Sequence, residues 1–351
     1  TAHELTGPTH LPPDEVLTRE QVLRRLRYLA TVEHGLMVEY LYAYYSLAAP
    51  RKRPETAGPE QALYDAARVV LGVAIDEMRH FRWANEMLRE LGEPAELGRV
   101  VTFDDFDDSE RTFGHTFSLQ PLTWERLDWF IEVEKPSREV DPSRRPGSVD
   151  GLYTRLLLSI GQNQAFTETE RHQLQYLVKL IIDEGHDHYL RFSRVKEMLK
   201  GLDLPSRLRL PADPQPVPEG HPVHAYQQVA DSCYAVVLTT LRFVFEQGGT
   251  RIGEMLNAAR HAMYALDDAA QAAAVTGGAP LFRLPAQPPA AAPQVRLATA
   301  PGAGAPTFDS LIDPLVERAL EPLAATQDGR ALGERLRTRY AALTAAMHSL
   351  A

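Results

Sequence analysis

The sequence has 351 residues, of which 44% are hydrophobic and 24% are charged, as in an ordinary soluble globular protein. This length suffices for one large helical domain or two smaller ones. The net charge of −10 argues against nucleic acid and acidic membranes as partners, and no apolar run reaches the roughly 18 residues of a membrane span. The sequence also lacks a Gly-rich phosphate loop and a Gly-x-Ser-x-Gly elbow.

The single cysteine, Cys233, excludes an internal disulfide and a cysteine-based metal cluster. Its neighbours Tyr234, Val236 and Val237 are apolar, which favours a buried, unreactive thiol over a nucleophile. One cysteine fits a reducing compartment, and residues 1–10 are polar without the apolar core of a signal peptide. We therefore expect a cytoplasmic protein.

Helical patterns dominate the first 202 residues, and alternating strand patterns are almost absent. Thr18 with Gln21, and Thr167 with Glu170, form the capping boxes that begin two long helices. Between the helices, residues 95–121 are expected to be irregular, with a cluster of acids at Asp104, Asp105, Asp107, Asp108 and Glu110. Another loop is expected at 136–147. The predicted helices cover 18–47, 59–92, 123–134, 150–161 and 167–201.

The second half contains a different succession of segments. Residues 203–222 hold six prolines and are expected to form a linker. Helices are expected at 223–247, 251–274 and 307–350, the last broken near Pro314 and Pro322. The Ala-, Pro- and Gly-rich stretch 277–306 reads as a long, partly mobile surface loop. We therefore predict a helical bundle over 15–202 and a helical extension over 223–351 that packs on it.

Glu77 and His80 are the clearest candidates for chemistry. They are three residues apart, about 60° around a helix, so both can reach one metal ion. Helical spacing also places them on the apolar stripe of residues 70–91, where a carboxylate and an imidazole are costly unless compensated. The compensation is either a metal ion or an internal salt bridge, and the Glu-x-x-His pattern alone does not decide between them.

The first helix offers two glutamates, Glu33 and Glu39. Glu33 lies on one line with Met37, Tyr40 and Tyr44, whereas Glu39 is about 120° away around the helix. We therefore expect Glu33 to face inward and Glu39 to be a solvated surface charge. Tyr40 would lie over the site and hydrogen-bond a metal-bound carboxylate.

The third and fourth long helices offer further ligands. Glu134 shares a face with apolar residues, whereas Glu132 shares a face with charged ones and is expected to face water. Glu184 and His188 are four residues apart on an apolar face of the last helix. His186 points away from Glu184 in a regular helix and is expected to be exposed or outside the ligand set.

Four helices thus each place a glutamate on an apolar face, and two of them add a histidine within one turn. A helical bundle supplies this pattern to a pair of metal ions. Oxygen-rich ligands with two imidazoles suit iron or manganese better than zinc or calcium. The predicted metal ligands are Glu33, Glu77, His80, Glu134, Glu184 and His188.

This ligand order resembles that of the ferritin-like superfamily. More narrowly, the chain resembles the ferritin-like domain of the iminophenyl-pyruvate dimer synthase family, clearly over about residues 20–200 and more weakly beyond. The resemblance implies an all-α, ferritin-like four-helix bundle with additional C-terminal helices. It is carried by the stretches 33–34, 40–43, 76–81, 134–136, 159–161, 183–185, 188–189 and 191–192, and by a late match at 304–308.

The sequence departs from this resemblance at two points. The family spacing would place a histidine three residues after Glu184, whereas His188 follows by four; a π-bulge would absorb the extra residue. His186 is a competing nitrogen, so the choice between His186 and His188 stays open. The chain is also far shorter than a full dimer synthase, so only the fold and the metal site carry over, and not the named reaction.

The function that we expect is O2-dependent oxidation of a small organic substrate by a di-iron site. The substrate would be aromatic or amino-acid-like and belong to specialised metabolism, with O2 as co-substrate. Tyr40, Arg79 and Arg191 are the candidate catalytic or substrate-anchoring residues, although such arginines are more often structural. A homodimer and an external electron donor are compatible with this chemistry. The alternatives are iron oxidation and storage, a bundle that has lost its metal, and a dimanganese enzyme that dismutates peroxide.

The ligand assignment predicts a specific pattern of variants. Glu77→Ala and His188→Ala should lose both bound metal and activity, because each removes an inward-facing ligand. Glu39→Ala and Glu132→Ala should keep both. Metal analysis after anaerobic iron loading tests the assignment, and loss of metal in the Glu39 variant would mean that the wrong face of the first helix was chosen.

Overall fold

The structure is a computed structural model that describes residues 10–104, 112–137, 148–247, 251–284 and 307–350. The chain forms two compact units, Thr1–Leu208 and Arg209–Ala351. Their boundary lies inside the predicted linker 203–222, and the packing of the extension on the bundle stays a prediction. In the ranges that the structure describes, every helix is too short or too polar to cross a membrane.

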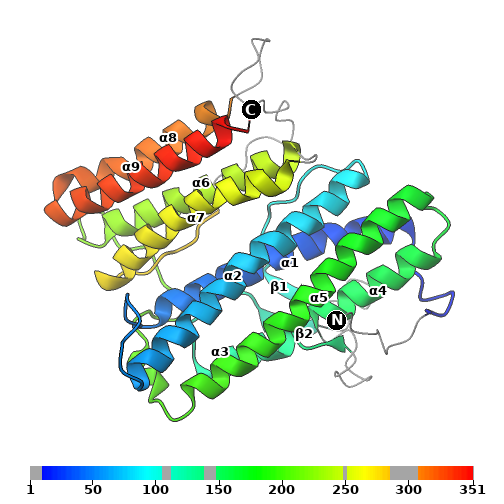
Figure 1. Cartoon of the computed structure of the whole chain (residues 1–351), viewed down its shortest axis with the longest axis horizontal. Coiled ribbons are helices and arrows are strands. Elements are labelled where there is room, and N and C mark those ends of the chain that lie inside the picture. Colours follow the sequence, from blue (N-terminus) through cyan, green and yellow to red (C-terminus); the bar gives the residue numbers. More distant parts are fainter. Residues whose placement is uncertain (1–9, 105–111, 138–147, 248–250, 285–306, 351) are drawn as a thin grey trace. The chain divides into compact units, whose positions relative to one another are not determined.

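The first unit is a helical bundle (Figure 1). Three long helices, α1 (Arg19–Ser46), α2 (Pro59–Glu90) and α5 (Glu168–Leu199), pack in the order α1, α2, α5. Two shorter helices, α3 (Trp124–Val133) and α4 (Val149–Gln162), both pack on α5 and together take the place of a fourth helix. A 3-10 turn, η3 (Leu204–Arg207), follows α5. The predicted all-α bundle with additional C-terminal helices is confirmed.

The helix ends follow the predicted capping chemistry. The Thr18 hydroxyl accepts a hydrogen bond from the Gln21 backbone, while the Gln21 side chain accepts one from the Thr18 backbone. Thr167 and Glu170 form the same reciprocal pair at the start of α5. The third helix is shorter than predicted, because α3 ends at Val133 and leaves Glu134 at its C-cap.

A short antiparallel hairpin lies in the segment that was expected to be irregular. Strand β1 (Thr102–Asp104) pairs with β2 (Thr112–Thr116), with Thr102 opposite Thr116. Strands of three and five residues are too short for their alternation to stand out in the sequence. The predicted acidic cluster falls mostly at 105–111, outside the described residues, as does most of the predicted loop 136–147.

Helix α1 is covered on all sides through its second half. Every residue from Val32 to Ala43 is buried. The hairpin region contributes to this cover, since the Val100 backbone N–H donates to the Thr31 carbonyl oxygen. A Cβ placed on Gly35 would come within 2.8 Å of the Phe117 ring, so the missing side chain lets this region approach α1 closely. Because this helix is buried on two faces, helical periodicity alone does not predict correctly which of its residues are exposed.

In the described ranges 209–247, 251–284 and 307–350, the second unit contains four helices and one 3-10 turn. These are α6 (His224–Gln247), α7 (Ile252–Val275), α8 (Phe308–Leu320), η4 (Glu321–Ala325) and α9 (Gln327–His348). The predicted break at Pro314 is wrong, because Pro314 lies inside α8 and its missing N–H costs a single backbone hydrogen bond. The break at Pro322 is confirmed by η4.

The start of the predicted surface loop 277–306 is part of the core of the second unit. Leu281 and Phe282 are buried, and the Phe282 ring packs edge-on against Tyr234 with the centroids 5.3 Å apart. The Gln227 side chain also donates to the carbonyl oxygen of Ala279, 3.2 Å away. The expectation of a surface loop is therefore wrong for 279–282, and residues 285–306 lie outside the described ranges.

Cys233 is buried in the second unit, as predicted. Burial raises the pKa of its thiol to about 12, and the Tyr340 hydroxyl donates to its sulfur at 3.0 Å.

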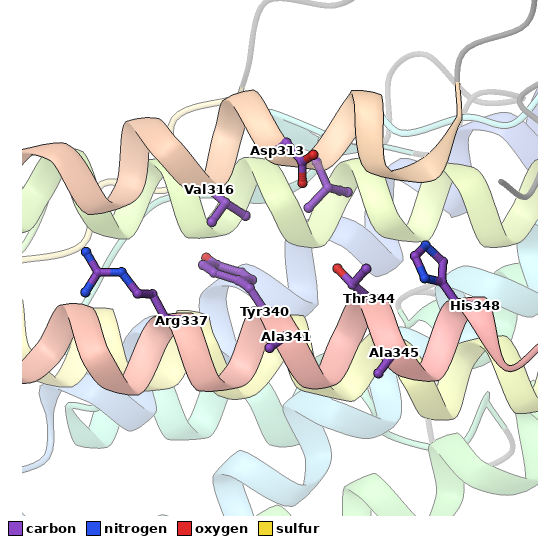
Figure 2. Close-up of a pocket in the computed structure, with 9 residues that line it drawn as sticks. Asp313, Val316, Arg337, Tyr340, Ala341, Thr344, Ala345 and His348 are labelled. Carbon is purple, nitrogen blue, oxygen red and sulfur yellow. The ribbon is translucent and has the colours of Figure 1, made fainter.

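A groove of about 480 Å³ runs between α8 and α9 (Figure 2). It is lined by Ile312, Asp313, Val316, Arg337, Tyr340, Ala341, Thr344, Ala345 and His348.

The close approach at Gly35 predicts a difference between two helical glycines. Gly35→Ala should lower the free energy of unfolding by about 1 kcal/mol or more, because overpacking against Phe117 and Val100 exceeds the gain in helix propensity. Gly72→Ala is the matched control, since its new Cβ would meet only the Arg191 guanidinium at 3.6 Å. Urea denaturation of the two variants measures the difference, and equal stabilities would contradict this account of the packing.

Candidate metal centre

Three long helices and the end of α3 bring the predicted ligands to one place in the first unit. Glu33 comes from α1, Glu77 and His80 from α2, and His188 from α5. Glu134, at the C-cap of α3, completes the set. All five side chains are buried, none more than 5% exposed.

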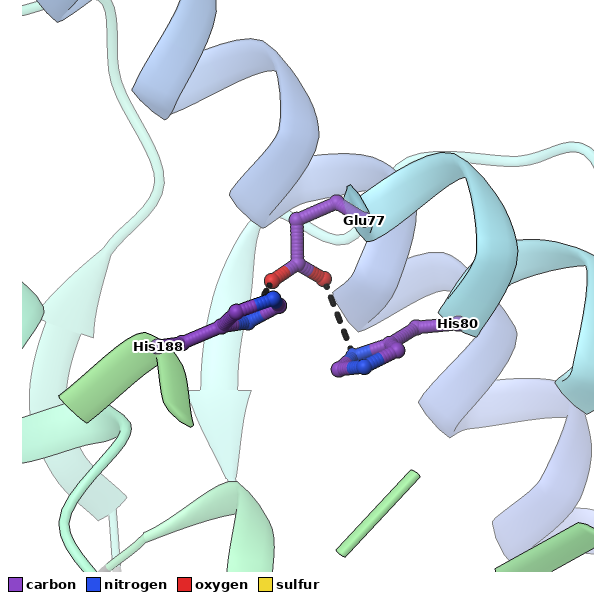
Figure 3. A group of neighbouring side chains, drawn as sticks. All are labelled: Glu77, His80 and His188. Atoms are coloured by element: carbon purple, nitrogen blue, oxygen red, sulfur yellow. Dashed lines mark ion pairs between the residues drawn. The ribbon is translucent and has the colours of Figure 1, made fainter. Parts of the chain in front are cut away.

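Glu77 lies between the two imidazoles (Figure 3). Its Oε1 is 2.8 Å from Nδ1 of His188, and its Oε2 is 3.4 Å from Nδ1 of His80. The two rings are nearly parallel, with centroids 4.8 Å apart. One carboxylate therefore presents an oxygen to each of two nitrogen donors.

Nδ1 of each histidine, which faces Glu77, also faces a second glutamate. Glu33 Oε2 is 3.7 Å from Nδ1 of His80, and Glu134 Oε1 is 3.8 Å from Nδ1 of His188. The cluster thus has two halves that share Glu77, each with one imidazole and one further carboxylate. We define these five residues, Glu33, Glu77, His80, Glu134 and His188, as the inner cluster.

Two buried tyrosines donate hydrogen bonds to the other two carboxylates of the inner cluster, those of Glu33 and Glu134. The Tyr40 hydroxyl donates to Glu134 Oε1 and the Tyr153 hydroxyl donates to Glu33 Oε1, both at 2.5 Å. Burial, followed by the facing carboxylate, raises the pKa of each phenol well above its ordinary value, so both stay protonated donors. Tyr40 was predicted to bind a carboxylate. Tyr153 was missed, although its spacing from the apolar residues of 152–160 could have placed it on the inner face of α4.

The charges of the inner cluster are mutually dependent. Burial raises the pKa of Glu33 to about 7. Burial also acts to raise the pKa of Glu77, but the two imidazoles outweigh it and lower that pKa. Burial acts to lower the pKa of His188, yet Glu77 and Glu134 raise it to about 9. Burial acts in the same direction on His80, and Glu77, Glu184 and Glu33 raise its pKa well above the ordinary value. A metal ion that binds here must therefore displace protons from both histidines.

Two features of the inner cluster suit metal ions: its donor types, and its buried polar atoms that lack hydrogen bonds. Six buried atoms make no hydrogen bond of normal geometry in the described part of the chain: Glu33 Oε2, both carboxylate oxygens of Glu77, Nε2 of His80 and both nitrogens of His188. Buried polar atoms are nearly always paired in native proteins. Ligation is the compensation that this set favours, and Glu77, His80 and His188 offer donor atoms within 4.8 Å of one another.

Glu184 lies outside the inner cluster. Its Oε2 is 3.3 Å from the outward nitrogen of His80, Nε2, and the Arg79 guanidinium donates to both of its oxygens. Although burial acts to raise it, the contacts with His80 and Arg79 lower the pKa of Glu184 to about 2. The predicted role of Glu184 as a ligand stays a prediction.

Of the two candidate histidines of α5, His188 lies in the inner cluster, 2.8 Å from Glu77 Oε1. His188 is fully buried, whereas His186 is half-buried and stacks on Tyr189. Helix α5 is regular between Glu184 and His188, so the π-bulge expected from their spacing is absent from this described helix. No distortion is needed, since Glu184 approaches the outer nitrogen of His80 while His188 approaches Glu77.

Arg79 and Arg191 bind carboxylates beside the cluster. Arg79 bonds Asp76 as well as Glu184, and Arg191 pairs with Asp76 at 2.8 Å and with Asp187 at 2.5 Å. Their side chains are 42% and 32% exposed. Both arginines therefore lie at the solvent edge of the site, and their catalytic role stays a prediction.

The prediction that Glu39 is a solvated surface charge is wrong. Glu39 is 2% exposed and accepts hydrogen bonds from Arg126 at 2.9 Å and from the Ser118 backbone at 3.0 Å. His115 and Trp129 also contact its carboxylate, at 3.1 and 3.3 Å. Glu39 lies on the far side of α1 from Glu33, but that side is covered too. By contrast, Glu132 is 61% exposed, as expected.

The fold has counterparts among known proteins. A family model described as ferritin-like matches residues 26–250. The crystal structure of a ferritin-like protein from Caulobacter vibrioides superposes with a TM-score of 0.52 at 20% sequence identity, covering 78% of this chain and 100% of that one. The likeness to this structure supports the fold alone.

Two curated relatives are enzymes by name. The 2-imino-3-(indol-3-yl)propanoate dimerase of Chromobacterium violaceum is 21% identical over 303 residues, covering 69% of this chain and 29% of the relative. The dichlorochromopyrrolate synthase of Lentzea aerocolonigenes is 29% identical over 137 residues, covering 34% of this chain and 13% of the relative. The chain spans less than a third of the length of either relative.

The burial of Glu39 changes what its removal should do. Glu39→Ala should lower the free energy of unfolding by about 3 kcal/mol, because it leaves the buried Arg126 guanidinium without its carboxylate. Metal content per folded chain should stay at the wild-type level, since Glu39 points away from the inner cluster. Urea denaturation combined with metal analysis checks both outcomes. Glu132→Ala is the exposed control, and a Glu39 variant as stable as that control would contradict the role of the ion pair.

Proposed function

This chain belongs to the ferritin-like family, and we propose that it is a non-haem di-iron oxidase or oxygenase that uses O2 to oxidise a small organic molecule. The observation that carries the proposal is Glu77 between two imidazoles, each accompanied by a further buried glutamate. Manganese is the alternative metal for the same donors.

The inner cluster divides naturally between two ions. Glu33 and His80 would hold one, Glu134 and His188 the other, and Glu77 would bridge them. An iron pair held in this way supplies the capacity to reduce O2 and oxidise an organic substrate. The chain itself orients the ligands. Tyr153 donates to Oε1 of Glu33 and leaves Oε2, which faces His80, for a metal, while Tyr40 donates to Oε1 of Glu134, the oxygen that faces His188.

Aromatic side chains exclude water around Glu134 and Tyr40. The Tyr40 ring packs edge-on against Phe130 and Phe192, with centroids 4.5 and 4.8 Å away. All three rings are fully buried. A dry setting strengthens the electrostatic hold of the carboxylates on bound cations and limits side reactions with water.

We propose a substrate that carries an aromatic ring and a carboxylate. Support comes from the two relatives, whose names refer to an indol-3-yl propanoate and to a chromopyrrolate. Arg79 and Arg191, both partly exposed beside the cluster, are suitable anchors for such a carboxylate. A role in specialised metabolism in the cytoplasm, a homodimer and an external electron donor belong to the same proposal.

The reaction with O2 tests the proposal. Anaerobic loading should give about two iron ions per chain, as expected for a bundle site of this kind. Mixing with O2 should then produce a transient visible absorbance that decays faster when an aromatic amino acid or its 2-imino derivative is present. Stopped-flow spectroscopy and product analysis by mass spectrometry measure these outcomes.

The controls separate this function from its alternatives. Glu77→Gln should hold fewer than one iron per chain, while Glu132→Gln should behave like the wild type because Glu132 is exposed. Growth of an iron mineral at many ions per chain would instead favour storage. Fewer than two metal ions per wild-type chain, with iron and with manganese, would refute the dinuclear site.

A further inference from the structure

Five alternating charges form a row across α2 and α5 at the solvent edge of the metal centre. In order they are Glu184, Arg79, Asp76, Arg191 and Asp187, each in contact with the next. Arg79 donates to two carboxylates at once, through Nη2 to Asp76 at 2.7 Å and through Nε to Glu184 at 3.3 Å. We call this row the charged rim.

Two members of the rim also touch the inner cluster: Glu184 contacts His80 at 3.3 Å, and Asp76 lies 3.9 Å from Nε2 of His188. Glu184 contacts the outward nitrogen of His80 and shares a face of α5 with His188, one turn away. The neighbouring backbone is close to the cluster, since a Cβ on Gly185 would lie 3.8 Å from Glu134 Oε2. Rotation of the Glu184 side chain about its own bonds would therefore exchange the Arg79 guanidinium for the metal pair.

That exchange has an electrostatic cost that depends on what else is bound. Without a cation, Glu184 would move toward the buried carboxylates of Glu33, Glu77 and Glu134, which repel it. With a cation but no anion, Arg79 would lose one of its two carboxylates. Both groups are satisfied when a metal receives Glu184 and an external anion takes its place on Arg79.

We infer that Arg79 binds the carboxylate of the substrate and that this anion releases Glu184 from Arg79 to the metal pair. The inference rests on the proposed function. Arg79 is suited to this exchange because its side chain is 42% exposed and its guanidinium is a bidentate partner for carboxylates. Binding of the anion and binding of the second metal ion then strengthen each other by the same factor.

Arg191 provides the matched comparison. It lies in the same rim, is 32% exposed and also pairs with two carboxylates. Its partners are Asp76 and Asp187; Asp76 lies 3.9 Å from Nε2 of His188, but neither partner is the carboxylate that Arg79 holds beside His80. Replacing Arg191 should therefore disturb the rim without changing the hold on Glu184.

The experiment is a calorimetric titration of the full chain with Co²⁺, which requires no turnover. In wild type, indole-3-propanoate should raise the affinity for the second Co²⁺ about five-fold or more, and indole-3-propanamide should not. In Arg79→Gln, the second Co²⁺ should bind more tightly than in wild type without any anion, and the carboxylate should have no effect. Without an anion, Arg191→Gln should bind the second Co²⁺ as weakly as wild type, because Arg191 does not hold Glu184. Arg79→Lys, which keeps the charge but loses the bidentate contact, should fall between the two.

The outcomes distinguish this inference from the function on which it rests. Two bound Co²⁺ with no response to indole-3-propanoate in wild type would overturn the role of Arg79 and leave the dinuclear site intact. An undiminished response in both Arg79→Gln and Arg79→Lys would overturn it as well. Fewer than two Co²⁺ in wild type under every condition would overturn the proposed function and this inference together.

Discussion

The contact of Glu77 with two imidazoles is the constraint around which the first unit is built. A carboxylate without solvent must be compensated, and Glu77 has a histidine on each of its oxygens, from α2 and from α5. Each histidine in turn faces a further glutamate from another element. Helices that could otherwise pack in several registers are thus held in one, because sliding any of them would leave buried charges unpaired.

The surroundings of this cluster are arranged in order of increasing exposure. The buried hydroxyl groups of Tyr40 and Tyr153 donate hydrogen bonds to glutamates of the inner cluster. The paired charges on α2 and α5 lie at the edge that meets solvent. Rigid, buried donors suit the holding of cations, whereas partly exposed ion pairs can exchange partners at low cost. The same site therefore combines a fixed interior with an adjustable rim.

A second buried charge system supports the site from outside. Glu39 joins α1 to Arg126 on α3 and to the segment that follows β2, so the two elements that precede Glu134 in the sequence are attached to α1. Because Glu39 and Tyr40 are adjacent, this attachment also fixes the helix that presents Tyr40 to Glu134. Helix α1 therefore carries two buried glutamates with different surroundings. Glu39 pairs with Arg126, whereas Glu33 faces His80 in the inner cluster.

The sequence by itself determined the helical class, the capped ends of the long helices and the glutamates and histidines that face the bundle interior. These features depend on local propensity and on periodicity within single helices, which one sequence contains. Only the tertiary structure decided the burial of Glu39, the contact of Tyr153 with Glu33, and the position of Glu184 on Arg79 outside the inner cluster. Each of these depends on a partner from another helix or from the hairpin, and periodicity within one helix carries no information about which element covers its second face.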